Sequence, residues 1–397
     1  MRKVRGIILS ILFQTLPVLL FTTIGEGFTG TLLGSMEDEL KILPGLLILI
    51  PAITDLRGNI GTAFGSRLST MLHLGLVKPL FRTGDLIREN IYASFSLSLS
   101  MSLFLGILAH FFSLGLGLSS IGPLRLSIIA VMSAILSSIV LLPFVFVLTV
   151  WLYKRGIDPD NIIAPLLPVF GDIVTVGAIL FSSKVVIRFF IHEPLSLYPF
   201  LGLFFLLGVT GVNKEKYRFL SILKESIPIL IMCSLLSAVS GTLLRTGERY
   251  FFAFPGVISL IPQVVEKGGS IGGVVGSRMS TALYLGQTKP FKIDKVTLGN
   301  FIGGASVGII ISPFVGIVVH FLLLFFNMDS LGLLYMILLS TLSISFLSLS
   351  MSLLSIFIAS ASFSFDLNPS NIVIPAITSI GDIAGVGFLL LILKILH

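Results

Sequence analysis

Long apolar runs separated by short polar loops follow one another along the whole chain of 397 residues. Lipid offers no hydrogen-bond partner to the backbone, so such runs must fold as helices or as a closed barrel. Runs of about 20 apolar residues are typical of helical crossings. Only 11% of the residues are charged, against about 25% in soluble proteins. The chain is therefore predicted to be an all-α polytopic membrane protein.

The apolar runs predict about 11 membrane spans at roughly 20 residues for each crossing. Five spans come first, one extra span follows, and five more complete the chain. The approximate ranges are 6–33, 43–75, 90–114, 124–152, 161–183, 195–211, 221–245, 254–286, 297–326, 331–361 and 371–396. The loops between them are too short to hold a soluble domain of ordinary size.

The last five spans repeat the first five residue by residue. Gly65-Ser66-Arg67 returns as Gly276-Ser277-Arg278, and Lys78-Pro79 returns as Lys289-Pro290. Self-similarity of this kind indicates a duplicated structural unit. The predicted segments are a first five-helix repeat at 1–188, a linking helix with an inner loop at 189–216, and a second five-helix repeat at 217–397.

The extra span determines how the two repeats are oriented. Five crossings reverse the direction of the chain, and one more crossing at about 195–211 restores it. The repeats should therefore be parallel, related by a pseudo-two-fold axis along the membrane normal. They form a pseudo-dimer within one chain, so a homo-oligomer is not required.

The distribution of basic residues predicts the location and the partners. The formal net charge of +7 is spread over the loops, which is typical of topology determinants and argues against a nucleic-acid partner. Positively charged loops face the inside of a membrane. We therefore expect a multi-pass protein of the cell membrane, surrounded by the lipid bilayer, with a cytoplasmic N-terminus and the C-terminus outside.

Two matching stretches each place one aspartate deep inside an apolar run. Asp158-Pro159-Asp160-Asn161 precedes Asp172, and Asn368-Pro369-Ser370-Asn371 precedes Asp382. An Asx-Pro pair is a good helix start, because the side chain caps free N–H groups and proline suits the first turn. Asp172 then lies about 17 Å along its helix at ~1.5 Å per residue. A carboxylate near the middle of a bilayer is costly and is a functional candidate.

These two aspartates suit a hydrated magnesium ion. Magnesium keeps several of its waters and is bound through one or two carboxylates. Pro165 and Pro375 cannot donate to the carbonyls of Asn161 and Asn371, so those oxygens are further candidate ligands. The alternative is that each aspartate is protonated or hydrogen-bonded and fixes helix packing.

The second span of each repeat carries an acid and a base close together. The first copy contains Asp55 and Arg57, and the second contains Glu266 and Lys267. Gly and Pro residues nearby predict a broken or kinked helix that lines the pathway. The acids could attract cations, or the neighbouring bases could neutralise them in a purely structural role. The sequence leaves both interpretations open.

Other polar residues in the spans give weaker signals. Asn59 offers an amide oxygen to a hydrated ion, whereas Ser270 stands at its place in the second copy. Glu26 lies late in the first span and is matched by Ser237. The serines of 94–100 alternate with a period of two, which on a helix spreads them over all faces and predicts close packing.

Two of these motifs carry a resemblance to a known family. They are Gly58-Asn59 with Ser66-Arg67-Leu68-Ser69-Thr70, and Asp158-Pro159-Asp160-Asn161 with Pro165 and Gly171-Asp172. The chain resembles the MgtE magnesium transporters over nearly its whole length, and most closely the duplicated solute carrier family 41 branch. The resemblance implies a pore between two five-helix units, lined by their second and fifth helices.

The resemblance also implies roles for single residues. Asp172 and Asp382 would contact the hydrated magnesium ion, and Asn59 would contribute from the second helix. Ser270 departs from the family pattern, so the second copy would contribute differently. The magnesium-sensing cytosolic domains of bacterial MgtE have no counterpart in this sequence, so their feedback gating does not carry over.

The sequence therefore predicts a transporter or channel for divalent cations and not an enzyme. Mg²⁺ is the predicted transported substrate. A magnesium exchanger coupled to sodium or protons is the alternative. An intramembrane aspartyl protease is more remote, because those enzymes share a Gly-x-Gly-Asp motif. This chain has Val169 and Ser379 where the first glycine of that motif would stand.

Overall fold

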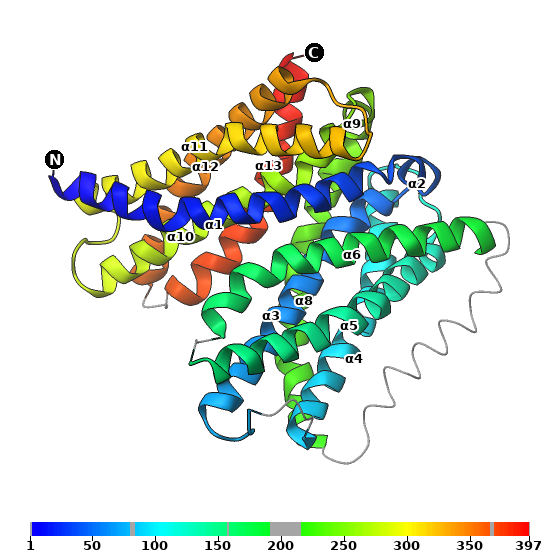
Figure 1. The fold of residues 1–397 in the computed structure, drawn as a ribbon, viewed down its shortest axis with the longest axis horizontal. Helices are drawn as coiled ribbons and strands as arrows, with labels where there is room; N and C mark the ends of the chain where they lie inside the picture. The colour runs from blue at the N-terminus through cyan, green and yellow to red at the C-terminus, as the bar shows by residue number, and fades with distance from the viewer. Residues whose placement is uncertain (1, 80–83, 157–158, 191–215, 366–368, 397) are drawn as a thin grey trace. The chain divides into compact units, whose positions relative to one another are not determined.

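The computed structural model describes residues 2–79, 84–156, 159–190, 216–365 and 369–396, and the secondary structure of these ranges is helical. The elements are α1 (Arg2–Gly34), α2 (Glu37–Ile42), α3 (Leu46–His73), α4 (Asp85–Gly115), α5 (Pro123–Lys154), α6 (Asp160–Phe190), α8 (Lys216–Thr246), α9 (Glu248–Ala253), the 3₁₀ helix η3 (Val257–Leu260), α10 (Ile261–Tyr284), α11 (Lys295–Phe325), α12 (Leu333–Ser364) and α13 (Pro369–Leu396) (Figure 1). The all-α prediction is confirmed for this part of the chain. The linking span expected at about 195–211 lies outside the described residues.

Eight helices in the described ranges are long and apolar enough to cross a membrane. They are α1, α4, α5, α6, α8, α11, α12 and α13. The remaining long helices, α3 and α10, carry charged residues and several glycines that lower their hydropathy. The chain is thus a helical, multi-pass membrane protein, and the number of about 11 spans stays a prediction.

The helices form two compact units. Unit 1 contains Met1–Ser35 and Thr246–His397, and so joins α1 to α9 through α13. Unit 2 is Met36–Arg245, and so joins α8 to α2 through α6. The first helix of each predicted repeat therefore belongs to the unit built by the later helices of the other repeat. The repeat boundaries stay a prediction from the sequence, since the compact units divide the chain differently.

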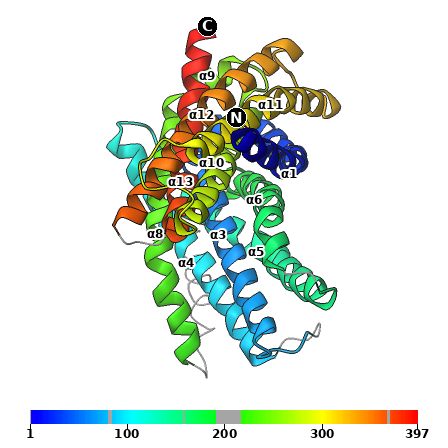
Figure 2. The same cartoon turned by 90° about the vertical axis from the view of Figure 1, so that its left-hand side faces the viewer.

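In unit 1, α1 runs along α11 and crosses η3 and α10, while α12 packs on α10, α11 and α13 (Figures 1 and 2). The crossing of α1 over η3 needs a glycine. A Cβ atom placed on Gly30 would lie 2.0 Å from the carbonyl oxygen of Ser259. Backbone touches backbone here, so no side chain can move aside to make room.

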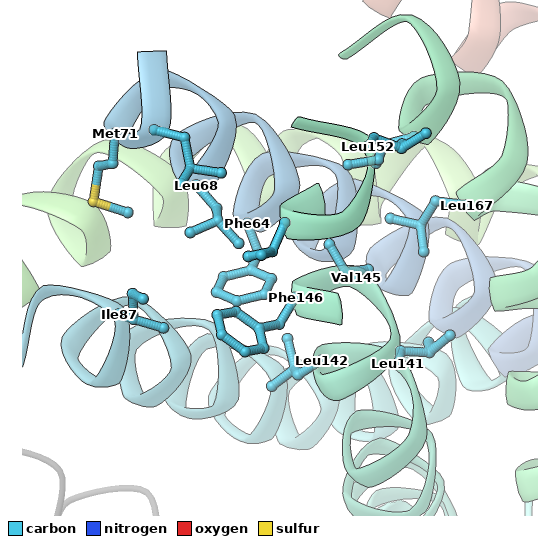
Figure 3. Close-up of a cluster of buried hydrophobic side chains, with 13 residues drawn as sticks. Phe64, Leu68, Met71, Ile87, Leu141, Leu142, Val145, Phe146, Leu152 and Leu167 are labelled. Carbon is cyan, nitrogen blue, oxygen red and sulfur yellow. The ribbon is translucent and has the colours of Figure 1, made fainter. Parts of the chain in front are cut away.

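In unit 2, α3 packs on α4, α5 and α6 around a buried apolar cluster that includes Phe64, Leu68 and Phe146 (Figure 3). The crossing seen in unit 1 recurs with exchanged partners. A Cβ atom on Gly241 of α8 would lie 2.4 Å from the carbonyl oxygen of Ile48 at the start of α3. Each first helix thus crosses the start of the second helix of the other repeat.

The two repeats also share local geometry far from these crossings. His110 Nδ1 lies 2.9 Å from Ser120 Oγ, and His320 Nδ1 lies 2.9 Å from Ser330 Oγ. The glycine that follows each serine by two residues has a φ angle of +95° in both copies, at Gly122 and Gly332. A left-handed backbone of this kind favours glycine, since it has no Cβ. The duplication therefore extends to individual turns.

Helix starts follow the sequence prediction better than helix breaks do. α6 begins at Asp160 and α13 at Pro369, directly at the two Asx-Pro pairs. For the second spans the sequence predicts a broken or kinked helix. A break is wrong for the glycine-rich motifs, because α3 and α10 each run through them without interruption, and a kink stays a prediction. Packing accounts for two of these glycines in α3. Cβ atoms on Gly61 and Gly65 would come within 2.8 Å of Leu167 and 3.0 Å of Ile163 on α6.

The close crossing at Gly30 predicts that the cost of a glycine-to-alanine substitution in α1 depends strongly on its position. Gly30→Ala should destabilise the protein by about 1–3 kcal/mol, the usual cost of overpacking. Gly6→Ala in the same helix is the matched control, because no atom lies within 4 Å of a Cβ placed there. Alanine in an open helical position is expected to be neutral or to stabilise by roughly 0.5–1 kcal/mol. Thermal unfolding in detergent would measure both, and equal melting temperatures for the two variants would contradict the crossing.

Candidate cation site

Asp172 and Asp382 occupy equivalent places, near the middle of α6 and of α13. Both side chains are half-buried. The structure thus keeps each carboxylate at mid-helix depth, as the sequence predicts. The two residues belong to different compact units, so each is described with its own unit.

In unit 1, Asp382 lies beside a close contact between α13 and α10. A Cβ atom on Gly381 would lie 2.9 Å from the backbone nitrogen of Gly269, and one on Gly385 would lie 3.0 Å from Val265 Cα. The two helices therefore touch backbone to backbone over one turn. That turn contains Asp382 on α13 and Glu266, which is half-buried, on α10.

In unit 2, the corresponding part of α6 is less closely packed. A Cβ atom on Gly171 would meet only Leu141 Cδ1, at 4.0 Å, and one on Gly58 would meet no atom within 4 Å. The helices α3 and α6 come together further along, where Gly61 faces Leu167. The two repeats therefore differ next to their aspartates: α13 touches α10 at Gly381, whereas the equivalent Gly171 of α6 makes no close contact.

Asp55 of α3 is held by neutral hydrogen-bond donors. Its Oδ2 accepts from Ser237 Oγ of α8 at 2.8 Å, and its Oδ1 accepts from Asn59 Nδ2 at 3.1 Å. Asp55 and Asn59 are both half-buried and lie one turn apart on one face of α3. Because Asn59 uses its amide nitrogen in this contact, its amide oxygen can accept a hydrogen bond from another group, such as a water on a hydrated ion. The structure brings together two of the predicted site residues.

Arg57 does not neutralise Asp55. Its buried guanidinium donates from Nη1 to Ser98 Oγ and Ser138 Oγ at 2.7 Å each, and from Nη2 to Ser102 Oγ at 3.4 Å. Among the residues described here, no carboxylate lies within ion-pair distance of it. Serine hydroxyls from α4 and α5 therefore take the place of a counter-charge. The structural alternative left open by the sequence does not hold for this pair.

The serines of α4 form a polar face, which corrects the packing interpretation. Asn90, Ser94, Ser98 and Ser102 are spaced by four residues and so share one side of the helix. Arg67 of α3 donates to Asn90 Oδ1 at 2.9 Å and to Ser94 Oγ at 3.0 Å. Every second serine in an alternating run returns to the same face, and the period-two argument overlooked this subset. The face receives both arginines of α3.

Lys267 forms its ion pair with Glu26 of α1, and not with Glu266 of its own helix. The Nζ of Lys267 donates to Glu26 Oε2 and, at 3.3 Å, to Thr22 Oγ1. Lys267 and Glu26 are both buried. One turn earlier on α10, Gln263 Nε2 donates to the carbonyl oxygen of Thr23 at 2.8 Å. A charged pair and an amide thus fix α1 against α10.

Two of the predicted ligands contribute less to the described geometry. The side chains of Asn161 and Asn371, in the first turns of α6 and α13, lie outside the described residues, so their roles stay predictions. Ser270, the counterpart of Asn59, is half-buried on α10. Within the described ranges, no three His, Cys, Asp or Glu residues gather as a metal cluster.

Sequence reasoning missed the partners of both buried bases. Glu26 and Lys267 are 241 residues apart, and Arg57 is 81 residues from Ser138. From local spacing alone, each base is expected to neutralise the acid nearest to it in the sequence. The one available signal was that Glu26 and Lys267 are both charged where their repeat counterparts, Ser237 and Leu56, are neutral.

Comparison with known proteins gives a family match in both repeats. The model of MgtE, described as a divalent cation transporter, matches residues 50–182 and 261–392, which is more than half of the chain. These ranges run from α3 into α6 and from α10 into α13.

Several curated proteins are similar to the chain over most of its length. Solute carrier family 41 member 3 of Mus musculus is 26% identical over 291 residues, covering 70% of this chain and 57% of that protein. Solute carrier family 41 member 2 of Xenopus laevis is 26% identical over 296 residues, covering 70% and 50%. The Homo sapiens member 2 is 25% identical over 283 residues, covering 67% and 47%. The chain thus spans about half the length of these relatives. Among solved structures, none matches it significantly.

The buried pair of Glu26 and Lys267 predicts a non-additive effect on stability. Glu26→Gln or Lys267→Met alone should cost about 3–5 kcal/mol, because each leaves a buried group without its partner. The double variant Glu26→Ser/Lys267→Leu, which installs the residues of the other repeat, should cost much less than the sum. A double-mutant cycle on unfolding in detergent would measure the coupling. Additive single effects would show that the two side chains do not interact.

Proposed function

Because the chain belongs to the MgtE family of divalent cation transporters, we propose that it moves hydrated magnesium across the membrane. The observation that carries this proposal is the pair of equivalent carboxylates, Asp172 and Asp382, each near the middle of the last helix of a repeat. Both lie inside the segments that match the family. In this proposal the two carboxylates act on the same ion, one from each repeat.

Two carboxylates are enough protein ligands for a hydrated magnesium ion. Magnesium gives up its waters reluctantly, and one or two carboxylates are enough to bind it in a largely hydrated form. Carboxylate oxygens accept hydrogen bonds from the waters on the ion, and the half-buried setting strengthens these bonds relative to bulk water. Larger or more weakly hydrated cations would present their waters at other distances. Selection would therefore act on the hydrated ion.

The second helices would supply unequal contributions to this path. In α3, the carboxylate of Asp55 accepts hydrogen bonds from neutral donors, and Asn59 offers an amide oxygen. In α10, Glu266 and Ser270 stand at the corresponding places. We propose Asp55, Asn59 and Glu266 as residues that attract or contact the hydrated ion, with the backbone oxygens of Asn161 and Asn371 as further ligands. The orientation with a cytoplasmic N-terminus belongs to the same proposal.

An exchanger coupled to sodium or protons needs a second cation site. The acids within the spans that could form one are Glu26, Asp55 and Glu266. Glu26 is already neutralised by Lys267, so coupling would have to act through the other two. This favours an uncoupled path for magnesium as the first hypothesis to test. The family consists of transporters, so the protease interpretation is set aside.

The two aspartates should control magnesium flux. Asp172→Ala/Asp382→Ala is expected to abolish magnesium uptake into liposomes loaded with a magnesium-sensitive dye, because both carboxylates in the path are lost. Asp329→Asn, which alters an exposed loop acid, is the control and should transport normally. Running the assay with and without sodium or proton gradients separates a channel from an exchanger. Unchanged flux in the double variant would reject the proposed site.

Magnesium should also stabilise the folded protein. A ligand that binds only the native state adds about 2.7 kcal/mol at 100 times its Kd. We expect the melting temperature of the purified chain to rise with magnesium, and the rise to disappear in Asp172→Asn/Asp382→Asn. Asparagine keeps the size of the side chain, so the variants should fold. An equal magnesium response in wild type and double variant would place the bound ion elsewhere.

A further inference from the structure

The loop that joins α10 to α11, residues 285–295, combines exposed lysines with exposed large apolar side chains. Lys289, Lys292 and Lys295 are all exposed. Between them, Phe291 is 58% exposed and Ile293 is 87% exposed. Contiguous exposed apolar patches that are rimmed by polar residues mark protein–protein or membrane interaction sites.

Hydrogen bonds hold this loop in a defined shape. Asp294 Oδ1 accepts from the backbone N–H groups of Val296 at 2.9 Å and Thr297 at 3.0 Å, which caps α11. Its Oδ2 accepts from Thr288 Oγ1 at 2.8 Å, and Thr297 Oγ1 donates to the carbonyl oxygen of Lys292 at 2.8 Å. The loop is therefore tied at both ends, and its exposed side chains are presented by a fixed backbone.

The backbone at Phe291 has a conformation that residues with a Cβ atom rarely adopt. Its φ angle is +56°, in the left-handed region that non-glycine residues seldom adopt. The ring packs edge-on against Phe357 of α12, with centroids 5.7 Å apart. Phe357 is itself 58% exposed. Loop and helix thus form one apolar surface with lysines on its border.

The position of the loop identifies the environment of this surface. α11 begins at Lys295 and is among the helices able to cross a membrane, so the loop directly before it lies where the hydrocarbon ends. At this depth lysine stems extend over apolar surface with the ammonium in the polar layer. A lysine in the first turn of a helix is opposed by the helix dipole, so helix stability does not explain Lys295.

The charge of the loop is positive in effect. Burial raises the pKa of Asp294, but the hydrogen bonds from Thr297, Thr288 and Val296 outweigh it and leave the pKa below its ordinary value. The carboxylate is therefore ionised at neutral pH and satisfies the first N–H groups of α11. Those N–H groups are not available to an outside anion. An anion that approaches the loop would therefore contact the three lysines.

We propose that residues 285–295 form a docking surface for the headgroup of an anionic phospholipid. Lys289, Lys292 and Lys295 would contact the phosphate, and Phe291 and Ile293 would enter the acyl-chain boundary. Juxtamembrane clusters of basic residues attract anionic lipids in this way. The surface lies in unit 1 and does not depend on how magnesium is bound.

Thermal unfolding of the full chain in an uncharged detergent tests this surface. Equal amounts of phosphatidylglycerol or phosphatidylcholine are added, and the measured quantity is the difference between the two melting temperatures. We expect phosphatidylglycerol to raise the melting temperature more. Lys289→Gln/Lys292→Gln/Lys295→Gln should lose at least half of that difference, because the phosphate contacts are removed.

Three further measurements separate the contributions of charge, apolar side chains and ligand. Lys41→Gln/Lys184→Gln/Lys394→Gln removes the same charge from other parts of the described chain and should keep the full lipid difference. Phe291→Asn/Ile293→Ser removes the apolar side chains, while asparagine tolerates the left-handed backbone, and should reduce the difference. Glycerol 3-phosphate in place of lipid should have little effect.

Three results would overturn the proposal. One is a wild type that does not distinguish the two lipids, and another is a loop triple variant that keeps the full difference. The third is an equal response to glycerol 3-phosphate, which would indicate a soluble phosphate site and not a lipid surface.

Discussion

A charge buried among membrane helices must find its partner inside the protein, and this constraint organises both units. Water and headgroups are out of reach at that depth, so the cost of an unpaired charge is high. Unit 1 meets it with an ion pair, in which Lys267 of α10 binds Glu26 of α1. Unit 2 meets it with neutral dipoles, in which Arg57 of α3 binds serines of α4 and α5. Each second helix is thereby fixed in rotation, and with it the face that carries Asp55 or Glu266.

The exchange of first helices explains why the two repeats could diverge in this way. Gly30 crosses η3 at Ser259, and Gly241 crosses α3 at Ile48, in matching geometry. In the described part of the chain, these contacts of a first helix with a second helix join residues of different predicted repeats. A charge that appears in one repeat, such as Lys267, can be balanced by one that appears in the other, such as Glu26. Each unit contains a similar close crossing of backbones, while the polar chemistry of the two units differs.

The sequence predicted the helical class, the starts of α6 and α13, and the mid-helix aspartates, because these depend on local signals such as apolar length and Asx-Pro caps. It could not predict the partners of Arg57 or Lys267, since those contacts join residues far apart through an exchange of helices. From the Gly and Pro residues of the second spans it also predicted a broken or kinked helix, and the two helices run through these motifs without a break. In α3 and α10 glycine allows close approach to Leu167 and Gly381, a role that periodicity alone does not separate from a kink.

We propose that Asp172 and Asp382 bind one hydrated divalent cation. Crystals of the full chain grown with manganese, whose anomalous scattering marks the ion, test it most directly. A shared hydrated ion should give an anomalous peak within reach of both carboxylates but beyond the ~2.1 Å of direct coordination by a magnesium-like ion, with waters between. A peak bound elsewhere, such as beside Asp55 alone, or the absence of any peak near the two aspartates would contradict it.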